Sequence, residues 1–413
     1  MVTVTEPLAF NPFDPGFRVN PYPVYRRLLA EDPVHKTPFG MLVLSRYRDC
    51  AAILRDPRCS SDASHSNMYK AFMAGRDPEE VFGALAGMRP FLFMDPPDHT
   101  RLRSLVQKAF TPKTVENLRP RIQELVDDLM APALEQGSME VIEDLAYPLP
   151  VRVITEMLGV PHEDHDTFKG WSRELAGALD PDFATPDDVA QRRERAAAAF
   201  VEYFQGLIAD RRRAPRDDLL SALITAEDEG HKLSEKELLS TLILLLVAGH
   251  ETTVNLIANG VLALARNPDQ LQRLREDPTL ARTAVEEVLR FDPPVQFTAR
   301  VALDDIDIDG TTLGKGDQAI VLVGAANRDP EHFPDPDTFD VGRQDNRHLA
   351  FGLGAHFCLG APLARVEGQV ALEALATRVE DLAIAVEQPE YKTNIVLRGL
   401  AALPVTFRAA TPT

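Results

Sequence analysis

The 413-residue sequence contains few cysteines: Cys50, Cys59 and Cys358. Their number is odd, they lie far apart, and no C-x-x-C or cysteine–histidine spacing typical of a zinc site accompanies them. This pattern argues against a disulfide framework and favours reduced thiols in a cytoplasm.

Net positive charge is also lacking, since the formal charge is −19 and the isoelectric point is near 5.0. Binding to nucleic acid or to an anionic membrane is therefore not expected. Long hydrophobic runs are scarce as well: LILLLVAG at 242–249 is too short to span a bilayer. The N-terminal stretch lacks the positive and apolar regions of a signal peptide. We expect a cytoplasmic monomer.

The apolar pattern predicts a mainly α protein. From about residue 98 to 292, apolar residues recur at three- and four-residue spacing, which is typical of helices. Near 301–323 the period changes to two around an Asp309-Gly310 turn, which indicates a small sheet. The expected organisation is one domain over 1–413, with a β-rich part at approximately 1–60 and 295–325 and a helical body at approximately 95–292 and 359–377.

One cysteine stands in an unusual loop, HLAFGLGAHFCLGAPLAR at 348–365. Cys358 lies among glycines and directly before a helical pattern that carries Pro362 in its first turn. The free N–H groups at a helix N-terminus favour a thiolate, which can bind a metal or act as a nucleophile. The alternative is a small buried hydrophobic residue, where free cysteine is often found.

Two further motifs carry polar groups into apolar surroundings. Ser234 and Glu237 form a capping-box pattern, so a long helix is expected to begin near 234. Within it, Glu251 and Thr252 interrupt the apolar run LLLVAGHETTVNLI, although burying such groups unpaired costs roughly 1–3 kcal/mol each. A solvated helix end is the alternative. The third motif is the pair Glu287 and Arg290, which in isolation indicates a surface ion pair.

Together, these motifs resemble the cytochrome P-450 family, soluble bacterial type, over roughly residues 94–365. The cysteine loop matches the family's signature at Phe351, Gly354, His356, Cys358 and Gly360, with Gly352 inside it. The central helix is similar to the acid–alcohol motif at Ala248, Gly249, Glu251 and Thr252. Glu287 and Arg290 are similar to the family's E-x-x-R element. The resemblance implies the P-450 fold, a helical body with a smaller β-rich part.

The family pattern also implies roles for these residues. Cys358 would be the proximal thiolate of haem b, whose electron donation favours O–O cleavage. Ala248 and Gly249 would let the helix pass close over the haem, while Thr252 and Glu251 would guide protons to dioxygen. The haem propionates would be held by His99, Arg103, Arg300 and His356, and Arg101 and His348 would be structural. Thr338 stands where many members carry an arginine that partners the E-x-x-R pair, and Arg343 is the expected substitute.

The implied function is a monooxygenase that hydroxylates or epoxidises a bulky lipophilic substrate. A polyketide or macrolide, a terpenoid or steroid, and a fatty acyl chain remain open. No flavin or nicotinamide fingerprint is present, so electrons from NAD(P)H would come through a ferredoxin or flavodoxin with its reductase. This partner is expected to dock near Cys358 on Lys108, Arg101 and Arg365. A peroxide-driven oxygenase and a haem-thiolate ligand sensor are the alternatives, but neither would need Thr252 and Glu251.

Candidate pocket walls are apolar for the most part. The irregular stretch 60–94 could cover the pocket through Met68, Phe72, Phe82, Leu85, Phe91 and Leu92. The resemblance adds Leu244, Val247, Ala248, Val295, Gln296 and Ile395. Such aromatic and aliphatic residues more often form ordinary core, which is the alternative interpretation here.

Overall fold

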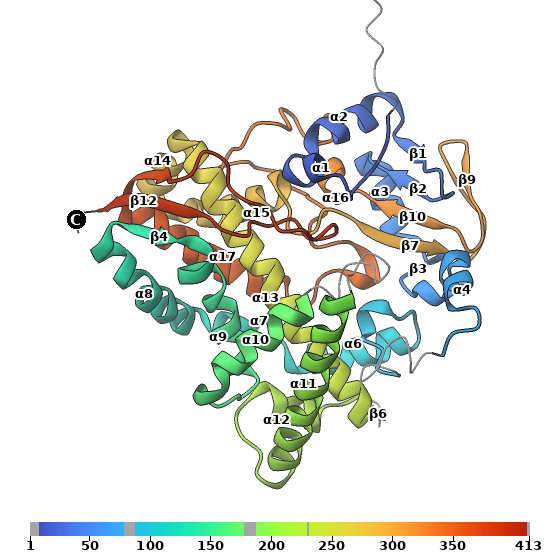
Figure 1. Ribbon diagram of the computed structural model, residues 1–413, viewed down its shortest axis with the longest axis horizontal. Helices are drawn as coiled ribbons and strands as arrows, with labels where there is room; N and C mark the ends of the chain where they lie inside the picture. Colours follow the sequence, from blue (N-terminus) through green and yellow to red (C-terminus); the bar gives the residue numbers. More distant parts are fainter. Residues whose placement is uncertain (1–7, 78–86, 177–186, 229–230, 411–413) are drawn as a thin grey trace, which may run out of the picture.

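The computed structural model describes residues 8–77, 87–176, 187–228 and 231–410. Figure 1 shows a helical body and, at the upper right, a β-rich part formed by strands from the N-terminal part of the chain and from residues 298–321. The helices are α1 Pro15–Val19, α2 Tyr22–Glu31, α3 Tyr47–Arg55, α4 Asn67–Met73, α6 Asp98–Ala109, α7 Pro112–Glu116, α8 Arg119–Gln136, α9 Pro148–Met157, α10 His165–Ala176, α11 Asp187–Arg213, α12 Leu219–Thr225, α13 Glu235–Arg266, α14 Pro268–Glu276, α15 Ala281–Phe291, α16 Val323–Ala326 and α17 Ala361–Arg378. The strands are β1 Val34–Lys36, β2 Leu42–Leu44, β3 Cys59–Ser60, β4 Ser138–Glu140, β5 Glu227–Asp228, β6 His231–Lys232, β7 Thr298–Ala302, β8 Ile306–Ile308, β9 Thr311–Leu313, β10 Gln318–Val321, β11 Val379–Ile384 and β12 Pro404–Ala409.

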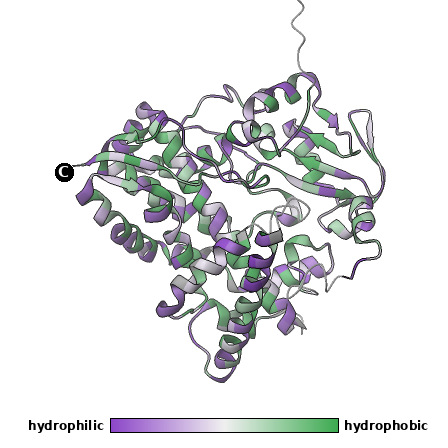
Figure 2. Cartoon of the chain, in the orientation of Figure 1, coloured by the Kyte–Doolittle hydropathy of each residue, from purple (hydrophilic) through white to green (hydrophobic). Residues whose placement is uncertain are grey.

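The predicted small sheet is confirmed and has five strands in the order β1-β2-β10-β7-β3. The pairing of β2 with β10 is parallel and joins Leu42 to Ala319, so the two distant parts of the chain share one sheet. The predicted turn between β8 and β9 is also present: Asp309 and Gly310 both have positive φ, at 54° and 81°. Such a pair of values suits a tight two-residue hairpin. In Figure 2 hydrophobic residues, in green, alternate with hydrophilic ones in the part of the protein that contains this sheet.

A second sheet lies outside the predicted β-rich part. Strands β11, β12 and β4 pair antiparallel in that order, so residues 379–384 and 404–409 correct the prediction. The strand β4 has three residues and follows Gly137, whose left-handed conformation ends α8. Such a short strand between helices gives no readable period of two, and its pairing depends on a partner more than 260 positions away.

The helix α13 forms the centre of the helical body. It begins with the predicted capping box, in which the Ser234 hydroxyl accepts from the Glu237 N–H and the Glu237 carboxylate accepts from the Ser234 N–H. By length and composition α13 could cross a membrane, but 67% of its most apolar window is buried inside the protein. Because α13 is covered on most sides, its apolar residues extend around the helix. A Cβ added at Gly260 would lie 3.0 Å from the Leu372 side chain of α17, so this glycine permits close helix packing.

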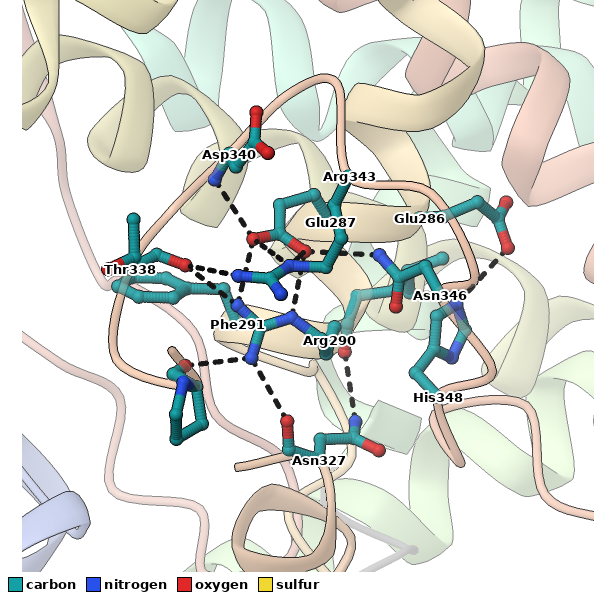
Figure 3. Close-up of polar contacts among 12 residues, drawn as sticks. Glu286, Glu287, Arg290, Phe291, Asn327, Thr338, Asp340, Arg343, Asn346 and His348 are labelled. Atoms are coloured by element: carbon teal, nitrogen blue, oxygen red, sulfur yellow. Dashed lines mark hydrogen bonds and ion pairs between the residues drawn. The ribbon is translucent and has the colours of Figure 1, made fainter. Parts of the chain in front are cut away.

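The pair Glu287 and Arg290 is buried, and neither side chain is exposed. Figure 3 shows the pair between α15 and the proline-rich segment, residues 326–347. Arg290 donates to both oxygens of Glu287 at 2.8 Å. It also donates to backbone oxygens of the proline-rich segment at Asn327, Pro336 and Thr338. The pair therefore joins the helix to a segment that has no regular structure of its own.

Arg343 is the predicted third partner, and its place in the network is confirmed. Its Nε lies 3.1 and 3.2 Å from the two Glu287 oxygens, and the carboxylate also accepts from Asn346 and from the Asp340 N–H. The side chain of Thr338 makes no such contact, but its carbonyl oxygen accepts from both arginines. Two guanidinium groups thus surround one carboxylate, which makes up for much of the cost of its burial.

Replacing Arg290 with leucine should strongly destabilise the protein. The change leaves Glu287 in a dry site with one cation fewer and removes three contacts to the proline-rich segment, so the free energy of unfolding should fall by about 3–5 kcal/mol. Urea unfolding at neutral pH measures this. The matched control is Arg273→Leu, which breaks the half-exposed pair with Asp340 and should cost less than about 1 kcal/mol. Equal losses in the two variants would contradict the structural role of the buried pair.

Candidate functional site

The loop that carries Cys358 is held at both ends by one carboxylate. Glu286 of α15 accepts from His348 at 3.2 Å and from Arg365 at 2.7 and 2.9 Å. Burial raises the pKa of Glu286, but these hydrogen bonds outweigh burial and lower it to about 2. Glu286 is therefore charged at neutral pH, and it fixes the distance between the start of the loop and α17. The prediction that His348 is structural agrees with this placement.

Within the loop, two glycines are required by the backbone. Gly352 and Gly354 have φ of +67° and +70°, a region that favours glycine. At Gly354 a Cβ would also lie 2.9 Å from the Leu54 carbonyl oxygen of α3. The Cys358 N–H donates to the Phe351 carbonyl oxygen at 2.8 Å, which closes the loop directly before α17.

The Cys358 side chain is exposed to water, yet protein surrounds it closely enough that burial raises the pKa of its thiol. The N–H groups of Gly360 and Ala361 and the guanidinium of Arg103 lower that pKa but do not outweigh burial. The N–H groups at the start of α17 therefore favour a thiolate, as predicted, but they do not outweigh the effect of burial. A coordinated metal ion would supply the missing positive charge, because a coordinating thiol is deprotonated by the metal.

The four predicted propionate ligands lie together. The rings of His99 and His356 are 4.1 Å apart, and the charges of Arg103 and Arg300 act on His356. Burial lowers the pKa of all four groups, with neighbouring positive charges contributing at both histidines, and the pKa of His356 falls to about 4. Both ring nitrogens of His99 are buried without a hydrogen-bond partner.

The nearby anion does not satisfy this group. Asp95 accepts instead from the Ser60 hydroxyl and the Ser61 N–H. Buried ring nitrogens without a partner, gathered with two arginines and a second histidine, are costly unless an anionic ligand completes the group. Two carboxylates, as on a haem, fit this set together with a free cysteine thiol, so the residues present suit the cofactor that the sequence resemblance implies.

Thr252 and Glu251 are neighbours in the sequence of α13, but their side chains have different surroundings. The half-buried Thr252 donates its hydroxyl proton to the Ala248 carbonyl oxygen at 2.8 Å. Beside Gly249, a Cβ would meet no protein atom within 4 Å, so open space lies against the helix there. Glu251 is buried and forms an ion pair with Lys392, while its second oxygen lies 3.6 Å from His250.

Several of these polar partners could not be found from the sequence. Lys392 lies 141 positions from Glu251 and belongs to no motif. His250 is adjacent to Glu251, but its other contacts, the Ser172 hydroxyl and the Leu246 carbonyl oxygen, depend on tertiary packing. The buried Glu367 of α17 was not predicted either, and nothing in the local pattern distinguishes it from surface glutamates.

The predicted pocket residues fall into two groups. Phe91, Leu244 and Val247 are buried in one hydrophobic cluster, with Leu92 and Ala248 packed against it. Val295 pairs with Leu397, and Ile395 packs against a separate N-terminal cluster. At Gln296, the side-chain amide accepts from the Tyr25 hydroxyl and donates to the Pro293 carbonyl oxygen. Its polar atoms are therefore used inside the protein.

The stretch 60–94 is only partly described. Met68 is exposed, and Phe72 is half-buried with Arg76 over its ring. Phe82 and Leu85 lie outside the described residues.

Two of the residues predicted for the docking patch have acidic partners within the chain. Arg101 pairs with Glu237 of α13, and Arg365 pairs with Glu286 and lies over the Phe351 ring. These guanidinium groups are already neutralised inside the chain, so they contribute less to attraction of an acidic partner than the sequence suggested.

Comparison with known proteins identifies relatives along nearly the whole chain. The Cytochrome P450 family model matches residues 59–380. The cytochrome P450 monooxygenase PikC of Streptomyces venezuelae is 45% identical over 402 residues, which cover 95% of this chain and 92% of PikC. The polyketide biosynthesis cytochrome P450 PksS of Bacillus subtilis (strain 168) is 39% identical over 415 residues, which cover 97% of this chain and 99% of PksS.

A similar solved structure is that of P450BioI in complex with hexadec-9Z-enoic acid ligated acyl carrier protein. It has a TM-score of 0.87 and 41% identity, and the match covers 95% of this chain and 99% of that one.

The buried Glu367 should make stability depend on pH. Burial raises its pKa from 4.5 to about 8, and the neighbouring Thr253 hydroxyl, which already donates to the Gly249 carbonyl oxygen, counteracts this only weakly. Between these two values the unfolded chain has lost the proton that the folded protein keeps, so rising pH destabilises the fold by about 1.4 kcal/mol per pH unit through this group. Stability from this group is therefore highest below pH 4.5 and is lost up to about pH 8.

The variant Glu367→Gln removes this dependence and should become progressively more stable than the parent from pH 5 to pH 8. Urea unfolding at each pH measures the difference. Glu373→Gln, a partly exposed position on the same helix, is the control and should leave the profile unchanged. A constant difference between Glu367→Gln and the parent at all pH values would contradict the assignment.

Proposed function

We propose a specific reaction for the chain from the premise that it belongs to the cytochrome P450 family. It is a monooxygenase that binds haem b through a cysteine thiolate and receives electrons from NAD(P)H through redox partners. The bound haem supplies activation of dioxygen, so that RH, O₂, two electrons and two protons give ROH and water. Relatives named as hydroxylases and monooxygenases support this function. They give no support to a ligand sensor.

Cys358 is our proposed iron ligand, because it is a free thiol in a fixed loop before α17. His99, Arg103, Arg300 and His356 would bind the propionates, and Phe351, Gly352 and Gly360 shape the loop around the thiolate. The observation that carries this assignment is that both ring nitrogens of His99 are buried without a hydrogen-bond partner, beside His356 and two arginines.

Thr252 and Glu251 are the proposed groups that handle protons. The Thr252 hydroxyl donates to the Ala248 carbonyl oxygen, and turning away from that carbonyl would let it donate toward the open space beside Gly249. Ala248 and Gly249 keep that space free of side-chain bulk. Glu251 is buried and pairs with the partly exposed Lys392, so it would supply protons to the Thr252 side from the solvent direction.

The substrate we propose is a polyketide or macrolide. PksS is named for polyketide biosynthesis, and 6-deoxyerythronolide B hydroxylase of Saccharopolyspora erythraea is 38% identical over 404 residues. Phe91, Leu244 and Val247 would offer the apolar surface that such a substrate requires. A library screen for substrate-induced spectral shifts, with macrolides, steroids and fatty acids as separate arms, identifies the class.

For electron supply we propose a ferredoxin with its reductase, with flavodoxin as the second candidate. The docking surface that we propose near Cys358 comprises Lys108, Arg101 and Arg365, and acidic partners within the chain offset part of the charge of the two arginines. We further propose that the protein works in the cytoplasm as a monomer.

The variant Cys358→Ser tests the iron ligand. Serine keeps the size of the side chain but does not provide a thiolate, so the reduced carbon-monoxide difference spectrum should lose its thiolate-type band. The parent protein, purified and reduced in the same way, is the reference. Cys59→Ser, at a half-buried thiol outside the loop, should keep the band. A thiolate-type spectrum in Cys358→Ser would overturn the assignment.

The variant Thr252→Ala tests proton delivery. NAD(P)H should still be consumed, but product formed per NAD(P)H should fall by about tenfold or more, because a positioned general acid contributes at least this much. The assay uses the substrate from the screen and measures peroxide as well as product. Thr253→Ala is the matched control, since Thr253 makes the same bond to the carbonyl four residues earlier but is buried. Equal coupling in both variants would contradict the role of Thr252.

A further inference from the structure

Lys392 lies on a hairpin between β11 and β12 that holds it rigidly. Tyr391 and Leu400 form a β-bridge, and backbone hydrogen bonds join Lys392 to Gly399 and Ala401 to Glu390. The Lys392 ammonium contacts the first carboxylate oxygen of Glu251 and donates to the Asn255 side-chain oxygen at 3.2 Å. The backbone of this hairpin therefore determines where the positive charge meets α13.

The Glu251 carboxylate depends on this lysine for its charge balance. Glu251 is only 4% exposed, and a carboxylate so deeply buried is costly without a cation. The second oxygen faces His250, but burial lowers the pKa of His250, and its ring is held by Leu246 and Ser172. His250 is therefore neutral at neutral pH and does not supply the positive charge.

The other groups around Glu251 do not replace the lysine. Burial raises the pKa of Tyr147 to about 12, and its ring lies 5.7 Å from that of His250, so this phenol is neutral. Arg173 lies over the outer face of Tyr147 and pairs with Glu143. Among the described residues, the cation in direct contact with Glu251 is Lys392.

The lysine also connects Glu251 to solvent. Its side chain is 20% exposed, and it lines a small cleft with Arg18, Tyr391, Asn394 and Ile395. At the inner end of this connection Glu251 is adjacent in sequence to Thr252. The cleft, Lys392 and Glu251 thus follow one another from solvent to α13, and Thr252 is the next residue of that helix.

We propose that Lys392 is the positioning residue of Glu251: it holds the buried carboxylate charged and in place at the solvent end of the proton path. This inference rests on the proposed role of Glu251 in proton supply. Lys392 touches neither substrate nor cofactor in this scheme and acts through the carboxylate. Removing its charge leaves Glu251 uncompensated in a dry site, where it takes up a proton and rotates freely.

The first experiment reads the carboxylate directly and does not depend on turnover. In the haem-loaded protein at pH 7, the infrared difference spectrum between Lys392→Met and the double variant Lys392→Met/Glu251→Gln should show the C=O stretch of a protonated carboxylic acid. The same difference between the parent and Glu251→Gln should show a carboxylate. Lys392→Arg keeps the charge and should restore the carboxylate signal. A carboxylate in Lys392→Met would overturn the proposal.

The second experiment measures the effect of the same variants on the reaction. Hexadec-9Z-enoic acid is the probe, and a ferredoxin with its reductase and NAD(P)H supplies the electrons. The pH profile of NAD(P)H oxidation should shift by at least about one unit in Lys392→Met and return in Lys392→Arg. The double variant should match Glu251→Gln, because the lysine acts through the acid. Arg408→Met removes an exposed cation of β12 that pairs with Asp381, and it should leave the profile unchanged.

These outcomes separate the two ideas. If Glu251→Gln itself leaves the profile and peroxide release unchanged, the proposed role of Glu251 fails and the inference on Lys392 fails with it. If Glu251→Gln alters both while Lys392→Met alters neither, only the inference on Lys392 is overturned.

Discussion

The rest of the site depends on the buried ion pairs of the Glu287 carboxylate with Arg290 and Arg343. This carboxylate sits in a dry position where two guanidinium groups, an amide and a backbone N–H converge, and these donors come from α15 and from the proline-rich segment. That segment has no helix or strand hydrogen bonds to satisfy its carbonyl groups. Arg290 satisfies three of them at once, and one belongs to Asn327. The Asn327 side chain then accepts from the Leu349 N–H, at the start of the cysteine loop. The position of the loop that carries Cys358 thus depends on the ion cluster around Glu287, through Asn327.

The proposed cofactor site also depends on charge, because it gathers more positive groups than negative ones. The chain carries a net charge of −19, yet His99, Arg103, Arg300 and His356 gather with little opposing charge. In the free protein burial opposes the charged form of each group, and the thiol of Cys358 is also held in its neutral form. Carboxylates and an iron ion correct both imbalances together. The cost of assembling such a site without its ligand is accordingly recovered when the ligand binds.

Features with a local cause could be predicted from the sequence. The capping box at Ser234, the turn at Asp309-Gly310 and the helix after Gly360 each depend on a few neighbouring residues. Arg343 could be predicted because the family pattern demands a cation there. The pairing of β4 with β12, the hydrogen bonds of Gln296 and the ion pair of Lys392 with Glu251 join residues far apart, and no local period records them. The thiol of Cys358 shows a different limit of sequence analysis. The helix N-terminus beside it was predicted correctly, but the opposing effect of burial on its pKa depends on the whole fold.

The hairpin that carries Lys392 is itself anchored to the N-terminal part of the chain. Arg398 pairs with Asp292 and donates to the backbone oxygens of Arg18 and Val19, while Arg18 donates to the Thr393 carbonyl oxygen. The Tyr22 hydroxyl completes the cluster on Asp292. The β-rich part therefore fixes a hairpin whose one lysine reaches the central helix. Because Asp292 directly follows α15, the helix that holds the cysteine loop on one side also holds this hairpin on the other. The acid of α13 and the proposed iron ligand are thus positioned from the same helix, by two ion clusters that share no side chain.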